Sequence, residues 1–283
     1  MSLRGSALLI VLLVSGLSMT AARAETRALL WAADYSLAAN TDLKLDNTLL
    51  DARAVADMLR RLGLRDVRLT ENPTAEVWNS ELEGLVQRLQ PEDVALLYYA
   101  GHAVQVGGRN YFLAADGVTL IASEDVLSTV MAKAKGTVFL IDACRDNPFR
   151  DAASRPGRTL KIDGLAVTGG AKGPTRAVSS VSLDELSRAA DGLSQMGNLR
   201  GKNTIVLFST DPGNVAVDGD PGRGSPFANA VVRELARRQS LDTAIRRITA
   251  EVDRQTGSRQ APWRQGDLTF SLFLAGQPRF PVP

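Results

Sequence analysis

Two continuous apolar runs, 94–99 (VALLYY) and 137–141 (TVFLI), constrain the fold of this chain more than any other feature. Each has the length of a strand, and hydrophobicity that is continuous rather than alternating is typical of a strand covered on both faces. Such strands belong in the middle of a mainly parallel sheet with helices on both sides.

Strand patterns and amphipathic helix patterns alternate along the rest of the chain. Apolar residues at three- and four-residue spacing predict helices at 47–62, 74–89, 123–134, 227–238 and 241–255. Further strands are expected at 27–33, 67–69, 204–208 and 268–274, with a small hairpin at 104–112. This order predicts an α/β fold of three layers, α/β/α, around a mainly parallel central sheet.

The first 24 residues have the features of a secretory signal. Arg4 precedes a short apolar run at 7–17, and 22–24 (ARA) forms a cleavage site of the small-x-small type. The run is shorter than the ~20 residues that span a bilayer comfortably. We expect cleavage after Ala24 and export to the periplasm or out of the cell. A retained N-terminal anchor is the alternative.

Residues 25–283 are expected to form one domain, with a larger part at about 25–150, a loop insert at about 150–202 and a smaller part at about 203–283. The insert is rich in Gly, Ser, Arg and Pro, and only 182–196, which begins with a capping-box pattern, predicts a short helix. Loss of Arg4 and Arg23 with the signal lowers the formal net charge from +2 to zero. The basic footprint of a nucleic-acid-binding protein is therefore missing.

The chain has one cysteine and one histidine, and both follow the central strands. His102 comes three residues after Tyr99, and Cys144 comes three residues after Ile141. Adjacent parallel strands would bring both to the rim where functional residues collect. A single cysteine cannot form an internal disulfide, and a thiol beside an imidazole is a typical nucleophile. Taken alone, each residue could instead be structural: a buried small cysteine, and a surface or capping histidine.

The sequences YYAGHA (98–103) and DACRDNPF (142–149) resemble the histidine and cysteine boxes of the caspase and metacaspase superfamily of cysteine peptidases. The caspase pattern Q-A-C-[RQG]-G is matched at 143–145 and broken at Asp142 and Asp146. The phrases at 45–64, 209–213, 223–232 and 257–263 are also similar to the family, so the resemblance covers nearly all of 27–274. It implies a caspase-like fold.

The resemblance implies that Cys144 attacks a peptide carbonyl, giving a thioester that water hydrolyses, and that His102 is the general acid/base. It implies an oxyanion hole made by the backbone N–H groups of Ala103 and Cys144. Relatives usually have glycine where this chain has Ala103. Alanine can serve there if its backbone has an ordinary conformation.

The resemblance also implies a substrate-binding pocket for a basic side chain. Caspases have Gln two residues before the nucleophile, whereas metacaspases have Asp and cleave after Arg or Lys; this chain has Asp142. A carboxylate in a partly desolvated slot favours a guanidinium or ammonium group. Asp51 in the first helix best matches the second pocket acid of metacaspases, and a solvated charge on that helix is its alternative role.

No cofactor is expected, because the chain lacks a phosphate-binding loop and a zinc-ligand cluster. Many metacaspases use calcium, but Asp218-Gly219-Asp220 lacks the further oxygen ligands of a calcium loop and is interpreted as an acidic turn. The insert holds basic residues that a protease of this specificity could cleave in its own chain, or that simply keep a loop soluble. They are Arg150, Arg155, Arg158, Lys161, Lys172 and Arg176.

The sequence therefore predicts an exported cysteine endopeptidase that acts on proteins or peptides with basic residues and, once the signal is cleaved, binds neither nucleic acid nor membrane. Two other interpretations stay open. One is a non-catalytic caspase-like module that binds peptides or partners, and the other is an esterase or amidase that uses the same pair of residues.

Overall fold

The computed structural model describes residues 24–106, 109–143, 159–166, 175–182, 196–211, 214 and 216–277. Several expectations fall wholly or mainly outside these residues, among them the signal segment up to residue 23, the nucleophile Cys144, and the helix expected at 182–196. Within the described part of the chain, no helix has both the length and the apolar character needed to cross a membrane.

The central sheet of the described chain has six strands in the order β11-β10-β7-β3-β1-β2, and every pair is parallel except β10 with β11. The strands are β1 (Thr26–Ala32), β2 (Asp66–Glu71), β3 (Val94–Ala100), β7 (Gly136–Asp142), β10 (Thr204–Phe208) and β11 (Trp263–Asp267). All residues of β3 and β7 are buried. The prediction that the two continuous apolar runs form the centre of a mainly parallel sheet is confirmed.

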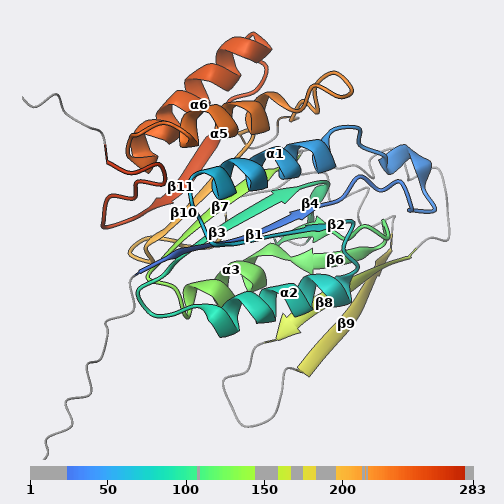
Figure 1. Ribbon diagram of the computed structural model, residues 1–283. Coiled ribbons are helices and arrows are strands. Elements are labelled where there is room, and N and C mark those ends of the chain that lie inside the picture. Colours follow the sequence, from blue (N-terminus) through green and yellow to red (C-terminus); the bar gives the residue numbers. More distant parts are fainter. Residues whose placement is uncertain are drawn as a thin grey trace, which may run out of the picture.

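Helices cover both faces of this sheet, as Figure 1 shows. On one face lie α1 (Thr48–Arg61), α5 (Pro226–Leu235) and α6 (Leu241–Thr256), and on the other lie α2 (Ala75–Arg88) and α3 (Ser123–Met131). Side chains alternate along a strand, so Leu96 packs in the core under the first group and Leu97 in the core under the second. The three-layer α/β/α architecture is therefore confirmed.

A second sheet packs beside the first and contains strands that the sequence pattern did not predict. Its order is β4-β5-β6-β8-β9, with β4 (Ala103–Val106), β5 (Arg109–Leu113), β6 (Thr119–Ala122), β8 (Thr159–Ala166) and β9 (Thr175–Ser182). The hairpin expected at 104–112 is β4 with β5. Strands β8 and β9 lie within the segment expected to be a loop, and they pair with each other and with β6. The alternation of polar and apolar residues at 159–163 (TLKID) is brief and ends at Gly164, and β9 has no regular alternation, so the sequence predicts no sustained strand there.

The last strand was predicted in the wrong place. The structure has β11 at Trp263–Asp267, antiparallel to β10, whereas 268–274 is irregular. The alternation at 268–274 does report burial, because its apolar side chains pack against the core under α5 and α6: Leu268, Phe270, Leu272 and Leu274. Its backbone is bonded differently, since the N–H of Leu241 donates to the carbonyl of Leu272.

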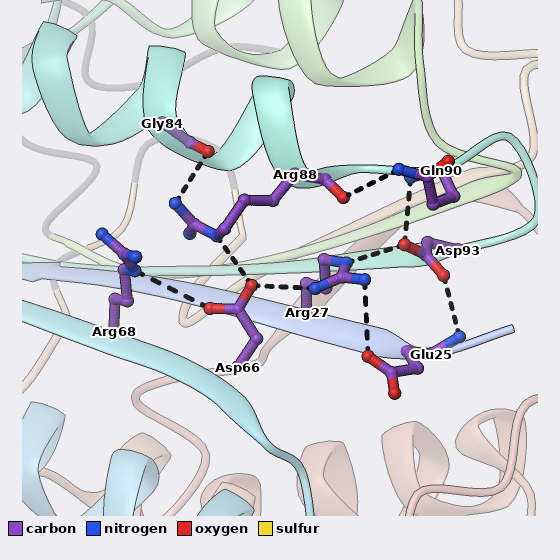
Figure 2. Close-up of polar contacts among 8 residues, drawn as sticks. All are labelled: Glu25, Arg27, Asp66, Arg68, Gly84, Arg88, Gln90 and Asp93. Atoms are coloured by element: carbon purple, nitrogen blue, oxygen red, sulfur yellow. Dashed lines mark hydrogen bonds and ion pairs between the residues drawn. The ribbon is translucent and has the colours of Figure 1, made fainter. Parts of the chain in front are cut away.

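An ion-pair network fastens the sheet where β1, β2 and β3 begin (Figure 2). The Asp93 side chain is only 2% exposed and accepts hydrogen bonds from the backbone N–H groups of Glu25 and Gln90 and from Nε of Arg27. The same guanidinium contacts Asp66, which Arg88 also binds. These bonds hold the pKa values of Asp93 and Asp66 below the usual range, although burial alone would raise them.

Because Asp93 is buried with three donors, Asp93→Ala should lower the free energy of unfolding by about 3 kcal/mol, since Nε of Arg27 and two backbone N–H groups lose their acceptor. The neighbouring Glu92 is 66% exposed and is the matched control. Glu92→Ala should change the free energy of unfolding by less than about 0.5 kcal/mol. Urea unfolding followed by circular dichroism measures both, and equal effects would contradict the network's role.

Candidate active site

Pairing of β3 with β7 brings the histidine box and the cysteine box to one rim of the sheet. Ala100 pairs with Asp142, and the N–H of Gly101 donates to the carbonyl of Asp142 across 3.2 Å. The chain thus carries His102 and Ala143 to the same edge. Cys144, the next residue, lies outside the described residues.

The imidazole of His102 is buried and held by the backbone carbonyl of Leu43, which lies 2.8 Å from Nε2 at the end of the short helix η1 (Thr41–Leu43). A carbonyl oxygen can only accept, so Nε2 carries the proton and Nδ1 is the basic nitrogen. Burial lowers the pKa of His102 to about 4, although the bond to Leu43 acts to raise it. The ring is therefore neutral at pH 7, as a general base must be.

Two buried tyrosines fix the backbone of His102. Its N–H donates to the hydroxyl of Tyr35 across 2.8 Å, and its carbonyl accepts from the hydroxyl of Tyr99 across 2.6 Å. The preceding residue must be glycine, because a Cβ on Gly101 would lie 2.6 Å from the Tyr99 oxygen and 2.8 Å from the Tyr35 oxygen. The tyrosine pair and Gly101 together explain why the histidine occupies this position.

The backbone of Ala103 points its N–H away from β5. The N–H of Leu113 donates to the carbonyl of His102, so Ala103 and Phe112 form a pair that exchanges no hydrogen bonds. Strand β4 is also the outermost strand in the order of the second sheet as described. The φ of Ala103 is not positive, so the alanine that replaces the usual glycine adds no backbone strain here.

The structure brings Asp51 and Asp142 together around Ser225. Its N–H lies 3.1 Å from each carboxylate oxygen of Asp51, and its hydroxyl donates to Oδ2 of Asp142 across 2.7 Å. Asp51 is 3% exposed and Asp142 is 8% exposed. A solvated position for Asp51, the alternative considered above, is therefore wrong.

These carboxylates line a small pocket whose wall includes Gly101, the residue before His102. Its walls come from α1 and the residues before it, from Gly101 and Ala143 on the rim, and from the segment 216–225. Asp218, interpreted above as part of an acidic turn, is a third acidic member of the wall. The pocket has a cavity volume of about 30 Å³, and none of its described lining residues is Lys, Arg or His.

Burial in this pocket disfavours negative charge. Desolvation, with the charge of Asp142 as the second cause, raises the pKa of Asp51 to about 8. Desolvation also raises the pKa of Asp142 to about 6, against the hydrogen bond from Ser225 and with a contribution from Asp218. The site therefore holds acidic groups that lack a compensating cation among its described residues. Nowhere in the described chain do three or more His, Cys, Asp or Glu side chains form a group that could hold a metal ion.

Sequence reasoning missed the residues that assemble this site. Ser225 is the N-cap of α5 and precedes Pro226, a pattern that indicates a helix start but not a contact with two aspartates. Tyr35 lies in an irregular segment without any pattern. The partners of both residues are distant in sequence, so local periodicity carries no signal for them.

Two of the basic residues considered for self-cleavage lie in paired strands. Lys161 belongs to β8 and Arg176 to β9, and hydrogen-bonded strands are poor protease substrates. The other four lie outside the described residues: Arg150, Arg155, Arg158 and Lys172.

Comparison with known proteins agrees with the resemblance of the two sequence boxes. A family model described as the caspase domain matches residues 26–273. Among solved structures, caspase-1 from Spodoptera frugiperda has a similar fold, with a TM-score of 0.57 and 17% sequence identity over 90% of this chain and 91% of that chain. No curated protein matches the sequence. Because the family model spans most of the chain, this protein belongs to the caspase-domain family of peptidases.

Proposed function

We propose that this protein is an exported cysteine endopeptidase that uses Cys144 and His102 and cleaves peptide chains after Arg or Lys. One observation carries this proposal: a pocket that contains the buried Asp51 and Asp142 is also lined by Gly101 and Ala143, the residues that directly precede His102 and Cys144. A pocket of this kind accepts a basic side chain and places the following peptide bond near the nucleophile.

The chemistry begins with proton transfer from the thiol of Cys144 to Nδ1 of His102 as the sulfur bonds to the peptide carbonyl carbon. The backbone N–H groups of Ala103 and Cys144 stabilise the oxyanion. The imidazolium then protonates the leaving amine, the C–N bond breaks and a thioester remains. His102 next removes a proton from water, which attacks the thioester and releases the acid and the thiol.

The environment of His102 supports this role. The bond from Nε2 to the Leu43 carbonyl orients the ring, and burial keeps it neutral until a proton arrives. The same carbonyl then stabilises the imidazolium that forms, because an N–H of a charged ring is a stronger donor.

Specificity follows from the charge of the pocket. Asp51 and Asp142 are buried together, and no cationic side chain is among the described residues that line their pocket. A guanidinium or ammonium group of the substrate therefore relieves the repulsion between the two carboxylates, whereas a substrate carboxylate adds to it. The substrates we propose are therefore proteins or peptides with exposed basic residues.

Fluorogenic peptides that end in Arg, Lys or Asp before the reporter group test the activity. We expect turnover of the Arg and Lys peptides at least about 100-fold above the Asp peptide, because a buried like charge opposes the acidic side chain. Cys144→Ala should abolish turnover, since it removes the sulfur.

Equal signals from the wild-type protein and Cys144→Ala would favour the alternative of a non-catalytic peptide-binding module. Hydrolysis of small esters without a preference for basic peptides would favour an esterase or amidase.

The buried acid pair predicts how stability depends on pH. Because the folded-state pKa values of Asp51 and Asp142 lie above the unfolded value of 3.8, their stabilising contribution is complete below that value and is lost as pH rises through about 6 and about 8. Asp142→Asn, which mimics the protonated form, should match the wild type near pH 4. At pH 8 it should be more stable by about 2 kcal/mol.

Urea unfolding at pH 4, 6 and 8 measures this difference. Asp57→Asn, at an exposed position on the same helix as Asp51, is the control and should keep the wild-type pH dependence. A constant gap between Asp142→Asn and the wild type at all three values would contradict the burial of charge in the pocket.

Export is the remaining part of the proposal. Ala24 is exposed, and the N–H of Glu25 donates to the buried Asp93 across 2.9 Å. Cleavage after Ala24 would turn this N–H into a charged amine beside a carboxylate, which strengthens the contact. Mass spectrometry of the protein expressed with its leader in a bacterial host should find a chain that begins at Glu25 outside the cytoplasm; an uncut chain anchored in the membrane would contradict export.

A further inference from the structure

Asp218 differs from the other two acidic residues of the pocket in its origin. Asp51 belongs to α1 and Asp142 ends β7, whereas Asp218 comes from the irregular segment 216–225 that forms the opposite wall. We propose that Asp218 is a specificity-determining residue of this pocket and makes it select arginine over lysine. This inference rests on the proposed function and names the substrate class more narrowly.

The position of Asp218 is fixed by a buried amide on one side. Asn47 is fully buried, and its Nδ2 donates to the carbonyls of Asp218 and Asp220 across 2.8 Å and 3.0 Å. Its Oδ1 accepts from the N–H groups of Gly222 and Gly224 across 2.9 Å and 3.3 Å. The side chain makes no capping bond to α1, so its hydrogen bonds serve the pocket segment. Asn47 is the positioning residue of that segment.

A second buried amide holds the other side of Asp218. Oε1 of Gln260 accepts from the N–H of Val217 across 3.0 Å, and Nε2 of the same residue donates to the carbonyl of Ser209 across 2.8 Å. Gln260 is fully buried. Asp218 therefore lies between two anchored points, which is the rigidity that a specificity residue requires.

The carboxylate of Asp218 also has a structural contact. Its Oδ2 accepts from the N–H of Asp46, just before α1, across 3.0 Å. A carboxylate has about four acceptor positions, so this bond leaves capacity for a ligand. Its charge reaches the other acids, because it contributes to the raised pKa values of Asp142 and Asp51. A purely structural role predicts a loss of stability alone, and a specificity role predicts a change in substrate preference.

Ligand chemistry explains why a third acid favours arginine. A guanidinium carries five N–H donors in a plane and can meet carboxylates on several sides at once. An ammonium group has three donors at a single point, and Asp51 with Asp142 already provides acceptors for them. Removal of Asp218 should therefore weaken recognition of arginine more than recognition of lysine.

Steady-state kinetics with Arg and Lys peptides of otherwise identical sequence test this inference. Asp218→Asn should lower kcat/KM for the Arg peptide about tenfold, mainly through KM, and for the Lys peptide by less than about threefold, because a hydrogen bond between charged groups is lost. The exposed Asp220 is the matched control, and Asp220→Asn removes the same charge from the same segment. It should leave both values within about twofold.

Three results would overturn the inference: no loss on either peptide, an equal loss on both, or the same change in Asp220→Asn. Asn47→Ala is a second variant and should lower the Arg to Lys ratio as well, without adding to the effect of Asp218→Asn in the double variant. Thermal unfolding of each variant separates a fold defect from a change in specificity.

A binding experiment keeps this inference separate from the proposed function. Titration calorimetry on the Cys144→Ala variant measures binding without any turnover. The two ligands are agmatine, which carries a guanidinium group, and cadaverine, which carries ammonium groups. Asp218→Asn should weaken agmatine binding about tenfold relative to Asp220→Asn and change cadaverine binding less. Absence of turnover in the wild type would refute the proposed activity alone, whereas agmatine binding equal in both variants would refute the role of Asp218.

Discussion

The pairing of β3 with β7 is the constraint on which the rest of the site depends. The two strands are in register along their whole length and are buried between two helical layers, so their carboxyl ends cannot shift relative to each other. That register places Gly101 against Asp142 and sends the chain at His102 and Ala143 along the same rim. The positions of the pocket, of the imidazole of His102 and of β4, the outermost strand of the second sheet among the described residues, all depend on this strand pair.

Burial of ionisable groups at the candidate site lowers the free energy of unfolding of the domain. Burial disfavours the charged forms of the imidazole of His102 and of the carboxyl groups of Asp51 and Asp142. The opposite end of the sheet compensates, because there Asp93 and Asp66 are paired with arginines and hold their charges with low pKa values. Paired charges at one end of the sheet and acidic groups without a paired cation among the described residues at the other distinguish a structural region from the region of the candidate site.

The sequence predicted those parts of the molecule that depend on local pattern. Continuous apolar runs identified β3 and β7, and three- and four-residue spacing identified the helices. The resemblance of the two boxes and of the first helix made His102, Asp142 and Asp51 candidate site residues. The sequence did not predict β6, β8, β9 or the true last strand, because these segments are short or lack a sustained period and are defined by the strands with which they pair. It also missed Ser225, which meets Asp51 across 174 residues of chain. Contacts between residues so far apart in the sequence produce no periodic pattern in it.

The contact between His102 and the Leu43 carbonyl has a consequence for how such a site can vary. The group that orients the ring belongs to the main chain, so replacing the side chain at position 43 leaves the oxygen in the molecule. Alanine-scanning mutagenesis would not detect this partner, and substitutions accumulated in evolution would not remove it, because both change side chains only. Only a change in the path of the backbone between β1 and α1 could remove it, which makes the length and shape of that connection, rather than its composition, the property that selection can act on.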